Sequence, residues 1–216
     1  MNITDNIIDI YIINTSTVED ETERVLPMIA PHYARKYEKA KVTNVKLQEL
    51  CAGFLLYKCL GINKDEQLTI SEYGKPSLNV QSIEKRTQFS LSHSDHYVIL
   101  AVSDTPVGVD IERADRVTLP ILKRVLPSVY YEKLKKKMFP PEIGFENDDQ
   151  LMYAKYWTSV EAILKATGTG FITDPRSNPN LMDEWYLKSS VLEKHFVMSC
   201  ASRTPFSINT VLIESI

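Results

Sequence analysis

The chain has 216 residues, of which 44% are hydrophobic and 25% charged, and its formal net charge is −3. This length allows one large domain or two small ones, and the charge does not favour a nucleic-acid partner. No apolar run approaches the roughly 18 residues that a membrane span needs. The three cysteines form no CxxC pair, which favours reduced thiols over a disulfide framework or a zinc site. Because the N-terminal stretch lacks the basic segment of a signal peptide, we expect a cytoplasmic protein.

The first half of the chain predicts strands that flank a group of helices. Residues 7–13 are rich in isoleucine and alternate like a strand. Residues 21–28 form a short helical segment, and residues 32–60 a long helical region that is interpreted as two helices ending at Gly61. Short strands follow at 68–71, 89–91 and 97–102, with a turn at 94–96.

The second half repeats this order. A strand at 107–111 precedes a basic helical stretch at 119–138, a loop at 139–150, a helix at 153–167, a connector at 175–183, and closing strands at 185–189, 195–201 and 207–214. The sequence therefore predicts an α+β fold with two pseudo-symmetric lobes, residues 1–104 and 105–216. In each lobe, helices cover a mainly antiparallel sheet.

The helix at 153–167 organises the second half. One apolar stripe follows a period of 3.6 residues, and it consists of Tyr153, Tyr156, Val160, Ile163, Leu164 and Thr167. Trp157, Glu161 and Lys165 share a neighbouring face, so that an acid and a base lie side by side. An exposed helix ion pair is the simplest interpretation of Glu161 and Lys165. A role in chemistry is the alternative, and the choice depends on residues about fifty positions upstream.

Those upstream residues are Gly108-Val109-Asp110-Ile111-Glu112. Residues i and i+2 of a strand point to the same face, so Asp110 and Glu112 converge. Two carboxylates held together favour a cation between them, and hard oxygen ligands suit Mg²⁺. An ordinary strand end with two solvated acids remains the alternative.

Two further sites carry polar residues. In Ser90-Leu91-Ser92-His93-Ser94, hydroxyls alternate on one face and end in a histidine that we expect at a turn, where Ser92 and His93 can bind phosphate. A capped turn with a satisfied imidazole explains the same residues. Lys75, in the Tyr-Gly-Lys-Pro turn at 73–76, is either an anion contact or a solvated lysine.

Taken together and in order, the segments YGKP, FSLSHS, GVDIE and WTSVEAILKATGTG resemble the Sfp-type 4′-phosphopantetheinyl transferases. The resemblance covers residues 72–171, and GVDIE with WxxxEAxxKxxGxG at this separation is a specific combination. It implies transfer of the phosphopantetheine arm from coenzyme A to a serine of an apo acyl or peptidyl carrier protein.

The resemblance also implies residue roles. The acids Asp110, Glu112 and Glu161 hold Mg²⁺ on the coenzyme A pyrophosphate, and Lys165 contacts phosphate. Asp110, Glu161 and Lys165 are thus the expected catalytic residues, and Glu161 is also a candidate base for the serine proton. The residues Lys75, Ser92 and His93 match positions that bind the nucleotide part. The sequence does not fix the oligomeric state, although a duplicated enzyme of this type can work as a monomer.

Departures from the family pattern leave an alternative open. Val160 replaces the lysine of the usual WxxKEA, Tyr130 stands where a glutamate is common, and residues 46–53 lack the arginine and small hydroxyl residue of the family. A degenerate member that binds coenzyme A or a carrier protein without catalysis is therefore the second hypothesis, and a purely structural domain is the third. The basic stretch 123–137 is either a docking site for an acidic carrier or a solvated helix face.

Overall fold

The computed structural model describes residues 6–72, 74–79, 87–138, 145, 148–168, 170–172 and 174–216. Tyr73 and most of the predicted loop 139–150 lie outside the described residues. The chain divides into two compact units, one made of Met1–Thr105 with Ser207–Ile216 and the other of Pro106–Phe206. The sequence placed residues 105–216 together in one lobe. In the structure the last strand belongs to the sheet of the first unit, because it pairs with an edge of β1 that the other strands leave open.

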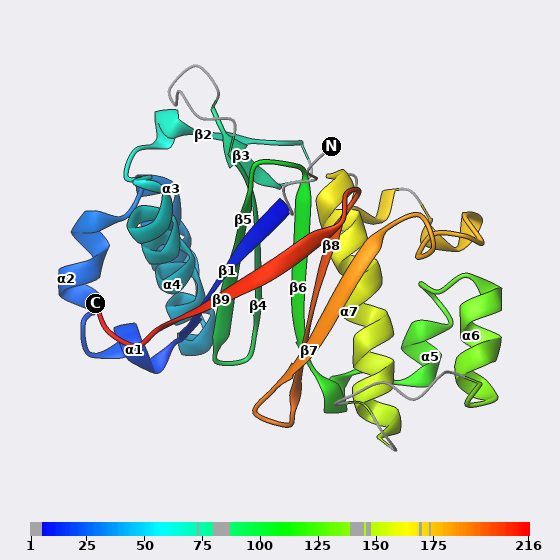
Figure 1. Ribbon diagram of the computed structural model, residues 1–216. Coiled ribbons are helices and arrows are strands. Elements are labelled where there is room, and N and C mark those ends of the chain that lie inside the picture. Colours follow the sequence, from blue (N-terminus) through cyan, green and yellow to red (C-terminus); the bar gives the residue numbers. More distant parts are fainter. Residues whose placement is uncertain are drawn as a thin grey trace. The chain divides into compact units, whose positions relative to one another are not determined.

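The first unit contains a four-stranded sheet with the order β4-β5-β1-β9 (Figure 1). Its strands are β1 (Asn6–Asn14), β4 (Gln88–Ser94), β5 (Tyr97–Ser103) and β9 (Phe206–Ile213). Strand β5 runs antiparallel to both β1 and β4. The predicted turn between β4 and β5 is confirmed, and Asp95 has a left-handed φ of 51° there.

The helices of this unit are α1 (Ser16–Glu19), α2 (Thr22–Val25), α3 (Pro31–Lys39) and α4 (Thr43–Leu60). The prediction of two helices across 32–60 is confirmed, and α4 stops at Gly61, whose φ is 68°. The buried face of α4 is almost wholly apolar, with Leu50, Phe54 and Leu55 in the core beside β1 and β5. The short strands β2 (Leu68–Ile70) and β3 (Pro76–Leu78) pair with each other.

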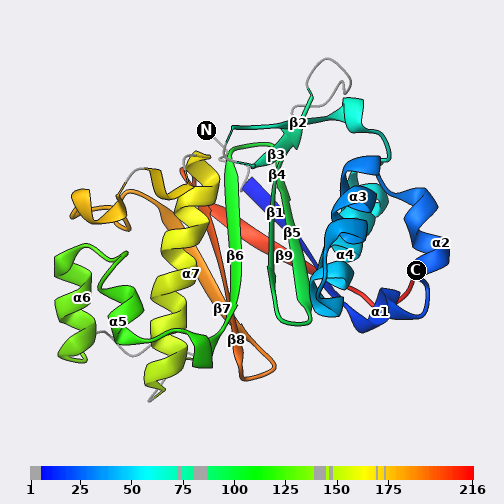
Figure 2. The same cartoon turned by 180° about the vertical axis from the view of Figure 1, so that it is seen from behind.

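The second unit is built on a three-stranded antiparallel sheet with the order β6-β8-β7. Its strands are β6 (Val107–Arg113), β7 (Tyr186–Leu192) and β8 (Phe196–Ser202), and helix α7 (Asp149–Thr167) packs along β6 and β8 (Figure 2). The Asp148 carboxylate caps α7 by accepting hydrogen bonds from the backbone N–H groups of Gln150 and Leu151.

The helical stretch predicted at 119–138 is helical in two parts and interrupted between them. Two helices occupy this stretch, α5 (Leu119–Leu122) and α6 (Ser128–Lys135). Pro127 sits at the N-cap of α6, because proline cannot donate a helical hydrogen bond and is tolerated only at a helix start. Lys136 and Lys137 therefore lie just beyond the end of α6.

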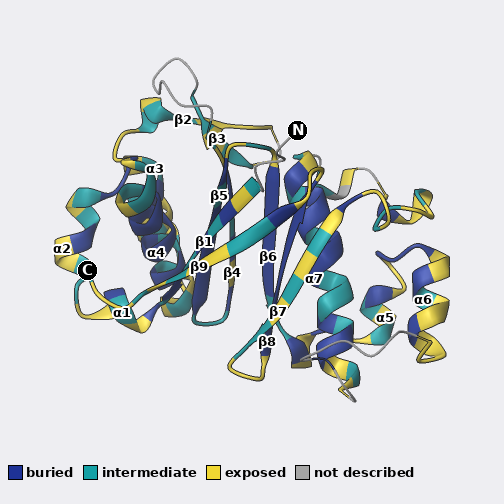
Figure 3. Ribbon diagram, viewed as in Figure 1, coloured by how far each residue is buried: buried dark blue, intermediate teal, exposed yellow. Residues whose placement is uncertain are grey.

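The α+β fold class is confirmed, and the two units share one arrangement. In each, a first strand is followed by helices, the last of them long, and a later hairpin, β4-β5 or β7-β8, pairs through its second strand with the first strand. Figure 3 shows β6 and β8 largely buried, whereas β7 alternates between exposed and half-buried residues. Among the described residues, no helix is long and apolar enough to cross a membrane.

Candidate active site

The candidate site lies in the second unit, where β6 comes unusually close to α7 at Gly108. A Cβ atom added at Gly108 would lie 1.9 Å from the Ala162 carbonyl oxygen and 2.5 Å from the Ala166 nitrogen. Backbone atoms cannot rotate away as a side chain can, so this contact requires glycine. Ala162 and Ala166 keep the facing side of the helix small. The close approach brings the side chains after Gly108 within reach of α7.

Asp110 is the first acid on β6, and it forms an ion pair with α7. The Lys165 Nζ atom donates to Asp110 Oδ1 at 2.7 Å. The Asp110 side chain is only 8% exposed, whereas that of Lys165 is 29% exposed. A buried carboxylate needs such a partner, since an unpaired one costs several kcal/mol of solvation. Asp110 and Lys165, which the sequence placed in one site, are therefore brought together.

Glu161 lies one turn before Lys165 on α7. Burial raises the pKa of its carboxyl group to about 7, and the negative charge of Asp110 adds to the rise. Lys165 opposes the rise, and Glu112 contributes to it. The charges of all three predicted acids therefore act on one another. A carboxyl group with a pKa near 7 is suited to accepting a proton at neutral pH.

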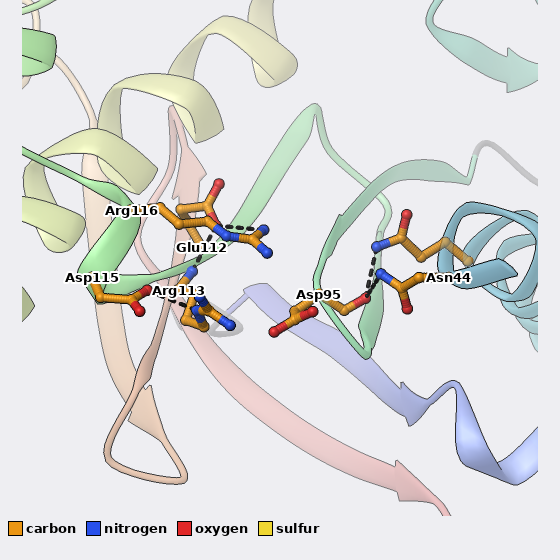
Figure 4. Close-up of polar contacts among 7 residues, drawn as sticks. Asn44, Asp95, Glu112, Arg113, Asp115 and Arg116 are labelled. Carbon is orange, nitrogen blue, oxygen red and sulfur yellow. Dashed lines mark hydrogen bonds and ion pairs between the residues drawn. The ribbon is translucent and has the colours of Figure 1, made fainter. Parts of the chain in front are cut away.

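Glu112, two residues beyond Asp110, is held by Arg113 at the end of β6 and by Arg116 of the short 3-10 helix Ala114–Arg116 (Figure 4). Its Oε1 atom accepts a hydrogen bond of 2.7 Å from the Arg113 backbone N–H, and Arg116 Nη1 lies 3.7 Å from the same oxygen. The Arg113 side chain turns instead to Asp115, at 2.7 Å. Sequence reasoning missed Arg116, although its i, i+4 spacing from Glu112 is a signal for an ion pair.

A buried hydroxyl cluster that the sequence analysis did not predict lies beneath α7. Ser199 of β8 is fully buried, and its Oγ lies 2.7 Å from Thr158 Oγ1 and 2.8 Å from Ser189 Oγ. Ser159 donates to it at 3.4 Å. Ser199 also lies opposite Asp110 in the register of β6 and β8.

The apolar stripe predicted on α7 is correct in its centre and incomplete elsewhere. Val160, Ile163 and Leu164 are buried, whereas Thr167 is exposed. The stripe omitted Thr158, Ser159, Ala162 and Ala166, which are also buried. Helix α7 is covered on more than one side, so a single amphipathic stripe underestimates its buried surface.

The three remaining predicted residues belong to the first unit. Ser92 is buried and His93 is exposed, because successive residues of β4 point to opposite faces of the sheet. His93 lies inside β4, and the turn begins only after Ser94. Lys75 follows Gly74, which has a φ of 80°, and its half-buried position lowers the pKa of its ammonium group. Its backbone N–H donates to Ser71 Oγ at 3.0 Å.

The three carboxylates are the type of ligand that binds a divalent ion such as Mg²⁺. Asp110, Glu112 and Glu161 offer hard oxygen donors whose charges repel one another, and Mg²⁺ binds such donors. Across the part of the chain that the structure describes, however, no three His, Cys, Asp or Glu side chains form a group able to hold a metal. Asp110 is paired with Lys165, and Glu112 contacts the Arg113 backbone N–H and Arg116.

Comparison with known proteins agrees with the motifs. Residues 106–200, which contain β6, α7 and most of β8, match the family described as the 4′-phosphopantetheinyl transferase superfamily. The resemblance predicted from GVDIE and WxxxEAxxKxxGxG is thereby confirmed.

Individual relatives carry the same description. The chain is 27% identical over 158 residues to the 4′-phosphopantetheinyl transferase Sfp of Bacillus subtilis, covering 70% of this chain and 66% of the relative. It is 29% identical over 163 residues to the transferase gsp of Aneurinibacillus migulanus, covering 71% and 64%. It is also 29% identical over 159 residues to HetI of a Nostoc species, covering 70% and 59%. The chain thus spans slightly less than two thirds of the length of these relatives.

Proposed function

We propose that this protein is an Mg²⁺-dependent 4′-phosphopantetheinyl transferase. It transfers the 4′-phosphopantetheine group of coenzyme A to a serine of an apo acyl or peptidyl carrier protein, and it releases 3′,5′-ADP. The observation that carries the proposal is the cluster of Asp110, Glu112, Glu161 and Lys165 within residues 106–200, the segment that matches the transferase superfamily.

Each residue of the cluster has a role in this reaction. Asp110, Glu112 and Glu161 would hold Mg²⁺, which when bound neutralises charge on the diphosphate of coenzyme A. Lys165 adds positive charge beside the leaving 3′,5′-ADP oxygen. The serine oxygen forms its bond to phosphorus while the bond to that leaving oxygen breaks.

Glu161 is the proposed acceptor of the serine proton, either directly or through a water. Its raised pKa, about 7, allows it to take up a proton near neutral pH. Its two roles compete, because a carboxylate bound to a metal is a weaker base. Lys75, Ser92 and His93 are proposed to contact the nucleotide part of coenzyme A, as their match to the family motifs implies.

One observation favours the second candidate, a member that binds without catalysis. Val160 stands where the family motif has a lysine, and its side chain is 0% exposed within the core around Leu164. This position therefore supplies apolar packing and no phosphate contact. The proposed enzyme therefore lacks a cation at position 160 and relies on Lys165, which lies beside Asp110.

The test is incubation of the protein with coenzyme A, Mg²⁺ and a panel of apo carrier proteins, followed by mass measurement of each carrier. The wild type should add the phosphopantetheine mass to at least one carrier. Asp110→Ala and Glu161→Ala should each lower the rate at least about 100-fold, because both remove charge stabilisation of the transition state. Glu19→Ala, at an exposed acid of α1, is the control and should keep the wild-type rate. Coenzyme A binding without modification of any carrier would instead support the non-catalytic candidate.

A further inference from the structure

The two acids of β6 each have a cation beside them in this structure. Lys165 Nζ lies 2.7 Å from the buried Asp110 carboxylate, and Arg116 Nη1 lies 3.7 Å from Glu112. The two cations come from different elements, α7 and the short 3-10 helix Ala114–Arg116 that follows β6. Both contact the strand whose two carboxylates point to one side.

Charge balance explains why such partners are present. Asp110 and Glu112 are alternate residues of β6, so their carboxylates lie on one side of the strand and repel each other, and Glu161 lies one turn before Lys165 on α7. Without a metal, part of this repulsion has to be relieved by side chains. Lys165 and Arg116 bring two positive charges to three acids. A divalent ion brings the same charge.

We propose that Lys165 and Arg116 are internal counter-cations that balance Asp110 and Glu112 while no divalent ion is bound. Each releases its carboxylate when the ion binds, and the Lys165 amine then becomes available to an anionic substrate. The inference rests on the magnesium site of the proposed function and adds two positioning residues to it.

Removing a counter-cation and removing a supporting residue have opposite effects on metal affinity. A residue that only supports the shape of a metal site weakens metal binding when it is removed. A counter-cation competes with the metal, so its removal strengthens metal binding. The effect is larger for Lys165, which contacts a carboxylate that is 8% exposed, than for Arg116, which is itself 46% exposed.

The experiment is calorimetric titration of Mg²⁺ into the full protein without coenzyme A, for the wild type, Lys165→Met and Arg116→Met. We expect the Kd for Mg²⁺ to fall about 10-fold for Lys165→Met and about 3-fold for Arg116→Met. Arg113→Met is the matched control. It removes a neighbouring cation that pairs with Asp115, and it leaves the backbone bond to Glu112 in place. Its Kd should stay within about twofold of the wild type.

The outcomes separate this inference from the proposed function. An equal or weaker Mg²⁺ affinity in both variants, with normal binding by the wild type, overturns the counter-cation role alone. A wild-type protein that binds no Mg²⁺ overturns the magnesium site as well. If Lys165→Met does not fold because Asp110 loses its partner, Arg116→Met decides the question, since Arg116 lies half-exposed at the surface.

Discussion

The two long helices of the molecule, α4 and α7, occupy equivalent places in their units and are packed by different chemistry. Each has about the same length, 18 and 19 residues, and each covers an antiparallel sheet. Beneath α4 the contacts are apolar, and polar contacts gather at its start, where Asn44 and Gln48 donate to the Asp95 carbonyl oxygen (Figure 4). Beneath α7 lie hydroxyls, a buried ion pair and a glycine contact with the backbone.

The α7 interface therefore carries an energetic cost that the α4 interface does not. Burying Asp110 and raising the pKa of Glu161 cost folding free energy that an apolar interface would not cost. Strained or costly groups concentrate at functional sites, where another benefit maintains them. At the α7 interface we therefore expect a substitution that disturbs the close backbone contact to destabilise the protein strongly. A substitution that removes a buried charge there should stabilise it.

The largest expected difference in stability is between alanine substitutions at two glycines, Gly108 on β6, which packs against α7, and Gly53 within α4. Gly108→Ala should lower the free energy of unfolding by about 3 kcal/mol or more, because the new Cβ atom would meet the Ala162 carbonyl oxygen at 1.9 Å. Gly53→Ala on α4 meets the Cβ atoms of Tyr33 and Ile29 at 2.9–3.0 Å, which cannot rotate away, but it gains helix propensity, so it should cost about 1–2 kcal/mol. Urea denaturation of both variants measures this. A smaller cost at Gly108 than at Gly53 would contradict the close backbone contact.

The next effect concerns one glutamate on each helix. Folding raises the pKa of Glu161, so its contribution to stability is fully present below pH 4.5 and is lost as the pH rises through about 7. Glu161→Gln should therefore stabilise the metal-free protein by about 1–2 kcal/mol at pH 8 and have little effect at pH 4.5, after allowance for solvent screening.

Glu49 of α4 provides the contrast, because its carboxylate lies 2.7 Å from Lys36 Nζ. Glu49→Gln should leave stability unchanged or slightly lower at pH 8. Denaturant titrations at both pH values, with a metal chelator present, measure the two effects. Equal behaviour of the two variants would remove the electrostatic contrast between the helices.

A smaller effect is expected at the hydroxyl cluster. Ser199→Ala removes the shared partner of Thr158 and Ser189, and it should lower the free energy of unfolding by about 1–2 kcal/mol. Thr158 keeps its bond of 2.9 Å to the Ala154 carbonyl, so the cost should not exceed this range. The double variant Thr158→Val with Ser199→Ala should cost less than the sum of the two single variants. Simple additivity would mean that the two hydroxyls do not interact.

The smallest effect concerns the surface around α6. Reversing the charge of the exposed residues Lys133, Lys136 and Lys137 should raise the carrier KM about 3–10-fold and leave coenzyme A affinity unchanged, if an acidic carrier docks there. Lys137 also loses its ion pair with Asp149, so the stability of the variant has to be measured as well. The control reverses the exposed Lys64, Lys188 and Lys194. The docking prediction fails if both triple variants change KM equally.

The sequence predicted the course of the backbone well and the packing of the site only in part. Strand alternation and the glycines at 61 and 168 located the strands and the ends of α4 and α7. Pro127, by contrast, was not used to divide the helical stretch at 119–138. The partner of β9 depends on which strand edge is open, and local patterns do not contain this information.

The motifs likewise selected Asp110, Glu112, Glu161 and Lys165 without giving their contacts. That Lys165 pairs with Asp110 depends on how closely β6 approaches α7, which is set by Gly108 together with Ala162 and Ala166. The cluster around Ser199 escaped notice because isolated serines in a strand are usual on exposed faces. Only the tertiary contact shows that these serines are buried.

The central claim is that one divalent ion is bound by Asp110, Glu112 and Glu161 when coenzyme A is present. The most direct measurement is a crystal structure with coenzyme A and Mn²⁺ in place of Mg²⁺, with the ion located from its anomalous signal. We predict a single Mn²⁺ ion about 2.2 Å from a carboxylate oxygen of each of the three acids and in contact with the diphosphate, with Lys165 turned from Asp110 towards phosphate. An ion bound elsewhere, or Asp110 still paired with Lys165 beside bound coenzyme A, would contradict the account.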